Sequence, residues 1–184
     1  AAFGAATASS PLLSQTPDVA SAMHWRSIGP IRAGRARALA GVPTQPHVVY
    51  AGFNNGAVGR STGYGTTWVP LLAPESRRAI GALPVAPSDP NVIYAGTGET
   101  TIRLDVSYGD GIYKSDDAGR SWRHAGLRES KHIGRICVHP GNPDIAYVAA
   151  LGEVFGPNET RGVFRTRDGG VTWGRVLHRG PDAG

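Results

Sequence analysis

Two polar segments of this chain carry the side chains best suited to acid–base chemistry. Residues 98–110 and 151–161 each combine carboxylates with an arginine and an aromatic ring. Two carboxylates that face each other across a sugar can cleave a glycosidic bond, one as acid and the other as base or nucleophile. For each carboxylate we expect a solvated or salt-bridged role rather than a catalytic one. The candidates for a catalytic pair are Glu99, Asp105, Asp110, Glu153 and Glu159.

Arginines accompany these carboxylates and form the predicted interaction surface. A sialidase-like site would need three arginines that converge on one carboxylate, together with a nucleophilic tyrosine. Arg32, Arg35 and Arg37 lie close together along one strand, so they are not expected to converge on one carboxylate as arginines from separate repeats would. The arginines that we assign to partner contacts are Arg32, Arg35, Arg37, Arg103 and Arg161.

The sequence gives no sign of a metal or cofactor site. The six histidines are scattered, and neither an H-E-x-x-H motif nor paired cysteines occur. The single cysteine, Cys137, excludes an internal disulfide and a C-x-x-C-H haem attachment. Because Cys137 lies in an apolar strand, we expect it to be a small core residue.

Two motifs that each occur three times must position the polar segments. The pattern [ST]-x-D-x-G-x-[ST]-W is complete at residues 115–122 and 166–173, and a copy at 61–68 carries Gly63 in place of the aspartate. Their tryptophans are 54 and 51 residues apart (122 − 68 and 173 − 122). The pattern P-x-x-P-x-[VI]-x-Y begins at Pro43 and Pro87, and a third copy begins at Pro140. A fixed period of this size indicates one supersecondary unit that is stacked repeatedly.

Each unit is predicted to form four short strands. An apolar first strand (residues 36–42, 80–86 and 133–139) ends at the double-proline turn, because proline lacks the backbone donor and fixes φ. A second strand rich in Val, Ile and Tyr follows. A third precedes the aspartate motif, at 111–114 and 162–165, and the tryptophan opens the fourth, at 122–124 and 173–176.

The aspartate motif is interpreted as a structural hairpin. A short carboxylate accepts hydrogen bonds from amides of its own turn, glycine supplies a positive φ, and tryptophan buries a large surface. The loss of the aspartate at Gly63 favours this interpretation, since a glycine can still make the turn. The residues given this role are Ser61, Gly65, Trp68, Ser115, Asp117, Gly119, Trp122, Thr166, Asp168, Gly170 and Trp173.

These motifs resemble the Asp box, or bacterial neuraminidase repeat (BNR), of β-propellers. Together with His-Trp-Arg-Ser-Ile-Gly-Pro at 24–30, they look like the sortilin-like and xyloglucanase-like branch of large secreted bacterial proteins, over roughly residues 23–178. Sialidases, endoglucanases and non-enzymatic receptors all carry the Asp box, so the resemblance implies a fold and not one function.

The expected fold is all-β, a partial β-propeller of about three four-stranded antiparallel blades with Asp-box hairpins. Closed propellers usually have about four to eight blades, so two blade faces would stay open. The chain is then either a fragment of a longer propeller or a protein whose partner covers these faces. The predicted divisions are an extended N-terminal tail (1–22), the propeller (23–178, with blades at 31–70, 79–126 and 132–177 and an extra strand at Trp25) and a C-terminal tail (179–184).

Charge and composition limit the classes of partner that this chain is expected to bind. The net charge of +5 is moderate, and the aromatic residues are committed to repeat positions, whereas a nucleic-acid site would interleave them with basic residues. An acidic protein surface or anionic lipid is the expected partner class. No stretch approaches the roughly 18 apolar residues of a membrane span. The Ala-, Ser- and Thr-rich first residues are typical of an exported chain after processing, which predicts a periplasmic or secreted location.

The leading functional hypothesis is a non-catalytic, extracytoplasmic interaction or scaffold module. It would be an extrinsic subunit docked on a larger envelope or membrane complex, such as a bioenergetic one. The alternative is a fragment of a carbohydrate-active or glycan-binding propeller, similar to xyloglucanases or sialidases. A third hypothesis is a sortilin-like peptide receptor domain, whose open blade edge receives an added strand.

Overall fold

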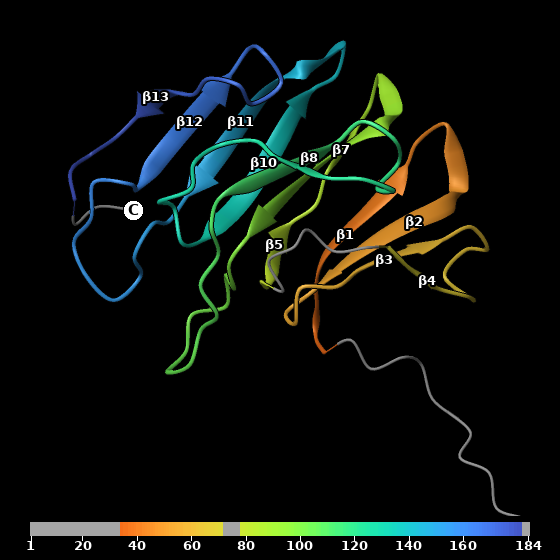
Figure 1. Ribbon diagram of the computed structural model, residues 1–184, viewed down its shortest axis with the longest axis horizontal. Coiled ribbons are helices and arrows are strands. Elements are labelled where there is room, and N and C mark those ends of the chain that lie inside the picture. Colours follow the sequence, from red (N-terminus) through yellow and green to blue (C-terminus); the bar gives the residue numbers. More distant parts are fainter. Residues whose placement is uncertain (1–33, 72–77, 182–184) are drawn as a thin grey trace, which may run out of the picture. The chain divides into compact units, whose positions relative to one another are not determined.

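The structure is a computed structural model that describes residues 34–71 and 78–181, and these residues form strands and no helix. The strands make three antiparallel sheets in chain order (Figure 1). The first contains β1 (Ala36–Val42), β2 (Gln45–Phe53), β3 (Val58–Ser61) and β4 (Val69–Leu71). The second contains β5 (Ile80–Ala82), β6 (Val85–Ala86), β7 (Asp89–Thr97), β8 (Ile112–Ser115) and β9 (Arg123–His124). The third contains β10 (Ile133–His139), β11 (Asn142–Ala150), β12 (Gly162–Thr166) and β13 (Gly174–Leu177).

The prediction of an all-β, partial propeller with about three blades is confirmed, and each sheet is called a blade from here on. Two details differ from the expected strands. The second proline of each double-proline motif is the second residue of β2, β7 or β11 and not part of the turn. The strand expected at 80–86 is interrupted between β5 and β6, where Pro84 has no amide proton and its carbonyl instead accepts the amide of Tyr94.

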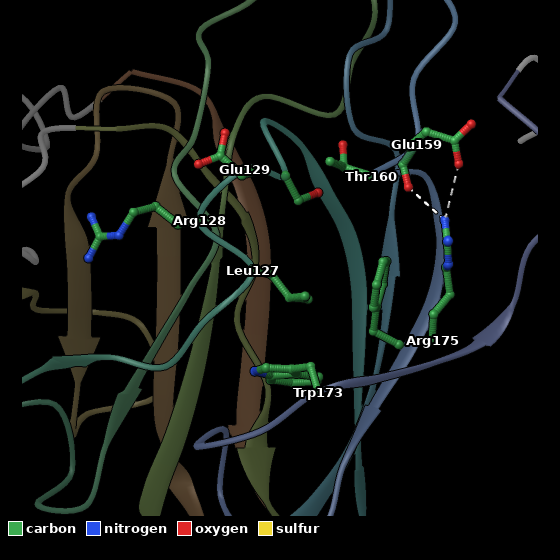
Figure 2. Close-up of a pocket in the computed structure, with 9 residues that line it drawn as sticks. Leu127, Arg128, Glu129, Glu159, Thr160, Trp173 and Arg175 are labelled. Atoms are coloured by element: carbon green, nitrogen blue, oxygen red, sulfur yellow. Dashed lines mark hydrogen bonds and ion pairs between the residues drawn. The ribbon is translucent and has the colours of Figure 1, made fainter.

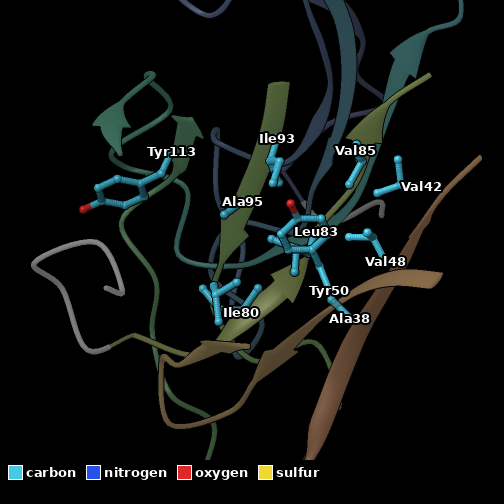
Figure 3. Close-up of a cluster of buried hydrophobic side chains, with 11 residues drawn as sticks. Ala38, Val42, Val48, Tyr50, Ile80, Leu83, Val85, Ile93, Ala95 and Tyr113 are labelled. Carbon is cyan, nitrogen blue, oxygen red and sulfur yellow. The ribbon is translucent and has the colours of Figure 1, made fainter. Parts of the chain in front are cut away.

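The second blade is buried on both faces. One face packs on the first blade, through a cluster that joins Val48 and Tyr50 to Ile80 and Ile93 (Figure 3). The other face packs on the third blade, where Tyr94 and its neighbours meet Ile133 and Val148. All residues of β7 except the first three are therefore buried, as expected for a strand with no solvent-facing side.

Glycines allow the blades to approach closely. A Cβ added at Gly52 would lie 2.5 Å from Cγ2 of Ile80 in the next blade. The same position of the second blade, Gly96, faces Ile133 of the third blade, 2.7 Å from its Cβ. Because real Cβ contacts are never this short, the first residue of each following blade requires a glycine opposite it.

The repeat tyrosines connect one blade to the next. Tyr94 is fully buried, and its hydroxyl donates to the carbonyl oxygen of Pro143 in the third blade at 2.8 Å. Tyr50 is 1% exposed, and its hydroxyl lies 3.4 Å from the carbonyl oxygen of Ala118 in the second blade. Burial raises the pKa of Tyr94 to about 12, so the hydroxyl remains a donor at neutral pH.

The three motif hairpins (residues 61–68, 115–122 and 166–173) share one set of hydrogen bonds. In the second hairpin, Ser115 Oγ accepts the amide of Gly119 at 2.8 Å, and Asp117 accepts the amide of Ser121 at 2.8 Å. The hydroxyl of Ser121 donates to the other carboxylate oxygen at 2.6 Å. Thr166 and Asp168 repeat these contacts in the third hairpin. The carboxylates thus close their own turns.

The first hairpin keeps its shape without the carboxylate. Ser61 Oγ still accepts the amide of Gly65 at 2.9 Å, and Trp68 Nε1 donates to the carbonyl of Gly65 at 3.0 Å. Each hairpin has two consecutive residues with positive φ, here Tyr64 at 53° and Gly65 at 85°. Sequence analysis anticipated the positive φ of the motif glycine and missed that of the residue before it.

The prediction that Cys137 is a core residue is wrong. Cys137 is exposed, because it alternates along β10 with Ile136, which points into the interface with the second blade. The predicted N-terminal tail, the strand at Trp25 and Arg32 lie outside the described residues, as do residues 182–184. No helix long and apolar enough to cross a membrane occurs in the part of the chain that the structure describes.

The close approach of the blades predicts unequal costs for two glycine substitutions in the first blade. Gly52→Ala should lower the free energy of unfolding by about 1–3 kcal/mol, because the new methyl group overlaps Ile80. Gly41→Ala is the matched control, since a Cβ there meets nothing within 4 Å, and should change stability by no more than about 0.5 kcal/mol. Urea unfolding measures both; equal effects would contradict the packing described.

The hairpin carboxylates predict a pH-dependent contribution to stability. Hydrogen bonds from Ser121 lower the pKa of Asp117 from 3.8 to about 2. A carboxylate whose pKa is lower in the folded state stabilises the fold at any pH above its unfolded-state pKa. This stabilisation disappears as the pH falls through the folded-state pKa. Asp117→Asn should therefore lower the urea midpoint at neutral pH, with a difference from wild type that shrinks between about pH 4 and pH 2.

The control for this measurement is Glu129→Gln, which removes an exposed carboxylate outside the hairpins. A midpoint difference for Asp117→Asn that stays constant down to pH 2 would show that the carboxylate charge does not hold the turn.

Candidate functional site

The long loops gather at the end of the blades opposite the motif hairpins (Figure 1). We call this region the loop end; it comprises residues 54–57, 98–111 and 151–161, which join second to third strands, and the connection 125–132. Backbone hydrogen bonds fix these segments to one another, from the amide of Gly109 to the carbonyl oxygen of Lys131 and from the amide of Leu151 to the carbonyl oxygen of His132. The two polar segments singled out in the sequence therefore lie at the same end.

Glu99 is the most enclosed carboxylate of the loop end. Its residue is 1% exposed, and Oε1 accepts from Arg35 at 3.0 Å and from Asn54 at 2.8 Å. Arg103, four residues further on, completes the cluster at 3.2 Å from Oε1. Two guanidinium groups and an amide thus converge on one carboxylate from the first and second blades.

The predicted interaction arginines have different positions. Arg35 and Arg37 both reach the loop of the second blade, the first to Glu99 and the second to the hydroxyl of Thr100 at 3.4 Å. Their side chains therefore contact another blade of the same chain, whereas sequence analysis assigned them to partner contacts. Arg161 instead holds its own loop, since its guanidinium donates to the carbonyl oxygens of Leu151 and Glu153 at 3.0 and 2.9 Å.

Glu153 belongs to a second cluster, in which the third blade meets the loop of the second. Lys131 Nζ lies 2.7 Å from Oε2, and the hydroxyl of Tyr108 lies 3.4 Å from Oε1. The hydrogen bond from Lys131 holds the pKa of Glu153 below its usual range. Lys131 also lies 4.6 Å from the centre of the Tyr108 ring, a cation–π contact.

His132 lies beneath this cluster and is fully buried. Its ring meets the edge of Tyr108 at a centroid distance of 5.4 Å. Burial lowers the pKa of His132, so the imidazole is neutral at physiological pH.

The remaining candidate carboxylates are also paired. Asp110 accepts from the hydroxyl of Tyr113 at 2.8 Å and lies 3.4 Å from Arg78. Asp105 is 84% exposed and lies 3.5 Å from Arg103. The carboxylate of Glu159 lies 3.7 Å from the guanidinium of Arg175, which also donates to the backbone carbonyl oxygen of Glu159 at 2.7 Å.

A groove of about 400 Å³ opens between the connection to the third blade and strands β12 and β13 (Figure 2). Trp173, Phe164 and Leu127 form its apolar part, and Arg175 and Glu159 lie at one side. Ser130 also lines the groove and is 2% exposed, and its hydroxyl has no hydrogen-bond partner among the described residues.

Sequence analysis missed several residues that build the loop end, namely Asn54, Lys131 and His132. The pair Lys131-His132 directly precedes the first strand of the third repeat, and this position was the available signal. Among residues 34–71 and 78–181, no three His, Cys, Asp or Glu side chains lie close enough together to hold a metal ion.

The geometry favours binding over acid–base catalysis. A glycosidase acid must keep its proton at working pH, which requires a raised pKa. Glu99 and Glu153 instead lie within hydrogen-bonding distance of guanidinium and ammonium groups, and the ammonium group of Lys131 holds the pKa of Glu153 below its usual range. The loop end can therefore present fixed charges and exposed apolar side chains to a partner.

The Glu99 cluster predicts a stability effect at the loop end. Glu99→Ala removes a buried acceptor of hydrogen bonds from two arginines and Asn54, and should lower the free energy of unfolding by about 1–3 kcal/mol. Asp105→Ala is the matched control, because its carboxylate is exposed, and should have an effect of at most about 0.5 kcal/mol. Thermal and urea unfolding measure both; a neutral Glu99→Ala would mean that the cluster does not fasten the first blade to the second.

Comparison with known proteins gives a likeness of fold. No family model and no curated protein matches the sequence significantly. Among solved structures, the GH74 xyloglucanase from Xanthomonas campestris matches 79% of this chain with 21% identity and a TM-score of 0.54. A structure of YCF48 bound to D1 peptide matches 80% of it with 14% identity and a TM-score of 0.57. YCF48 from Cyanidioschyzon merolae matches 85% with 12% identity and a TM-score of 0.58.

These matches cover only part of each known protein. The chain spans 24% of the xyloglucanase and 42% and 41% of the two YCF48 chains. Both kinds of neighbour are β-propeller proteins, and at these identities the likeness concerns the fold alone. The chain has the fold of consecutive β-propeller blades.

Proposed function

We propose that this chain is a non-catalytic interaction module that binds a protein partner through its loop end. The observation that carries this proposal is the pairing of the candidate carboxylates. Glu99 and Glu153, the two most suited to an enclosed site, each have a cationic group within 3.0 Å. Such pairs fix the loops in place and engage the carboxylate oxygens that a substrate would otherwise have to contact.

The loop end also exposes the apolar side chains that a partner could bury. Leu104 is fully exposed, and Ile102 and Phe155 are 58% and 57% exposed. Arg103, between Ile102 and Leu104, is paired with Glu99 and Asp105, and Lys131 is paired with Glu153, so the surface combines apolar anchors with paired charges. Interfaces are typically built from such anchors with a charged rim. The partner segment that fits is apolar with polar residues at its margins.

The proposal extends to the setting of the module. We infer an extracytoplasmic scaffold, an extrinsic subunit of a larger envelope or membrane complex, and regard the three motif hairpins as Asp boxes of the sortilin-like and xyloglucanase-like branch. The net positive charge and the motif resemblance support this placement. The neighbour YCF48, solved with a D1 peptide bound, is a precedent for peptide binding on this fold.

The test is purification of the tagged full-length chain from its source under gentle conditions, with mass spectrometry of everything that co-purifies. Purified partner and chain are then titrated against each other. The double variant Leu104→Ser/Phe155→Ser should weaken binding by about tenfold or more, as the loss of central anchors does. Val171→Ser, which removes a 74% exposed side chain from the third hairpin at the opposite end, is the matched control.

Retention of the partner by Val171→Ser and its loss from the double variant are the expected results. A chain that purifies alone, or that loses the partner equally with Val171→Ser, would contradict binding through the loop end.

A glycan-binding or glycan-cleaving role is the second candidate. Tyr108 and Phe155 expose their rings beside Glu153, an arrangement on which a sugar could stack, and the xyloglucanase neighbour shares the fold. Calorimetry with a xyloglucan oligosaccharide tests this candidate. If it is correct, Glu99→Gln and Glu153→Gln should abolish binding, whereas absence of heat with the unchanged chain would remove it.

A further inference from the structure

The outer blades each carry a large side chain that the described residues leave uncovered. On the third blade, Tyr147 is 41% exposed and lies opposite the exposed Cys137 in the pairing of β10 with β11. On the first blade, Leu39 of β1 is 70% exposed. These residues mark the two open faces, one on each outer blade.

The repeats show what covers the same positions elsewhere. Tyr147 corresponds to Tyr50 and Tyr94, which are 1% and 0% exposed and lie against the following blade. Leu39 corresponds to Leu83 and Ile136, which are 4% and 5% exposed and lie against the preceding blade. The third blade therefore has the face that receives a following blade, and the first blade has the face that receives a preceding one.

The sizes of two alanines make these open faces complementary. At the two interfaces inside the chain, a glycine of the second strand faces an isoleucine at the start of the next blade, Gly52 against Ile80 and Gly96 against Ile133. The corresponding residue of the third blade is Ala149, which is too large to face an isoleucine. The corresponding first residue of the first blade is Ala36, which is smaller than isoleucine by three carbons. One larger and one smaller residue thus compensate each other.

We propose that a second copy of this chain places its first blade on the open face of the third blade. The same contact in the reverse direction joins the other two open faces, so the dimer has two identical interfaces. Together the described residues of two copies supply six blades, which lies within the range of about four to eight that closes a propeller. This association does not depend on the loop end and stands apart from the partner binding proposed above.

Polar groups at the open faces fit the same arrangement. Tyr94 donates to the carbonyl oxygen of Pro143, and Pro46 occupies the corresponding position in the first blade. Lys114, the cross-strand neighbour of Tyr94, lies 2.9 Å from Asp144 of the next blade. In the third blade Arg165 is the cross-strand neighbour of Tyr147, and the residue that corresponds to Asp144 in the first blade is His47. A ring nitrogen of histidine that carries no proton can accept a hydrogen bond from a guanidinium group.

The first test uses the full chain as it exists. Sedimentation velocity over a dilution series should show a dimer that dissociates to monomer. Alkylation of Cys137 with iodoacetamide should slow as the protein concentration rises, because the second copy covers the thiol. A monomer at every concentration would overturn the proposal, whether Cys137 is freely alkylated or already covered by other residues of the same chain.

The second test replaces Ala36 by a larger residue and Ala149 by a smaller one. Ala36→Ile alone should overpack Ala149 and raise the dimer dissociation constant by about tenfold or more. Ala149→Gly alone should weaken the dimer to a smaller degree by leaving a gap. The double variant Ala36→Ile/Ala149→Gly recreates the pairs Gly52–Ile80 and Gly96–Ile133 and should restore dimerisation.

Both alanines are exposed in the single chain, so these variants should fold as wild type does, which circular dichroism checks. Rescue in the double variant requires direct contact between the two positions. A dimer that Ala36→Ile does not weaken, or one that the double variant fails to restore, would place the interface elsewhere and overturn the proposal.

Discussion

The structure depends on the distance between consecutive blades. Each blade is only four or five short strands, too thin to bury its own side chains, and burial comes from the neighbouring blade. The contact of Ile80 with Gly52 and of Ile133 with Gly96 sets the spacing at the inner strands. The buried tyrosines and the tryptophans of the hairpins fill the space further out. With the spacing fixed, the positions of the loop segments and of the hairpins follow, since they connect strands that can no longer move apart.

The two ends of the blades use charge differently. At the hairpin end, Asp117 and Asp168 satisfy donors within their own turns, and the contacts are local. At the loop end, Glu99 and Glu153 bind cationic groups from other segments and tie one blade to the next. Lys114 makes both kinds of contact, one to Asp116 of its own blade and one to Asp144 of the third blade. Burial lowers the pKa of Lys114, but the hydrogen bonds to these two carboxylates raise it by more, so the pKa lies above its usual value. Local carboxylates shape a blade and distant ones join two blades.

Sequence reasoning predicted what depends on neighbours along the chain. The strands β1 and β10 have the predicted bounds, and the hairpins form where the repeated motif indicated. It erred on Cys137, because an apolar strand has two faces and the sequence does not say which one a neighbouring blade will cover. It also missed the cluster at Glu99, whose partners Arg35 and Asn54 are 64 and 45 residues away. Contacts of that separation depend on blade stacking and loop path, which no local pattern encodes.

The burial of the second blade on both faces has a consequence for how the three repeats can diverge. A substitution that loosens the second blade weakens two interfaces within a single chain, whereas the same substitution in the first or third blade weakens one interface within the chain and, in the proposed dimer, one between copies. Before a dimer forms, the single chain should therefore tolerate substitutions in the first and third blades better than in the second. The hairpin that has lost its aspartate, at Gly63, belongs to an outer blade. The divergence of the three repeats from one another would then reflect how many neighbouring blades each repeat contacts within the single chain.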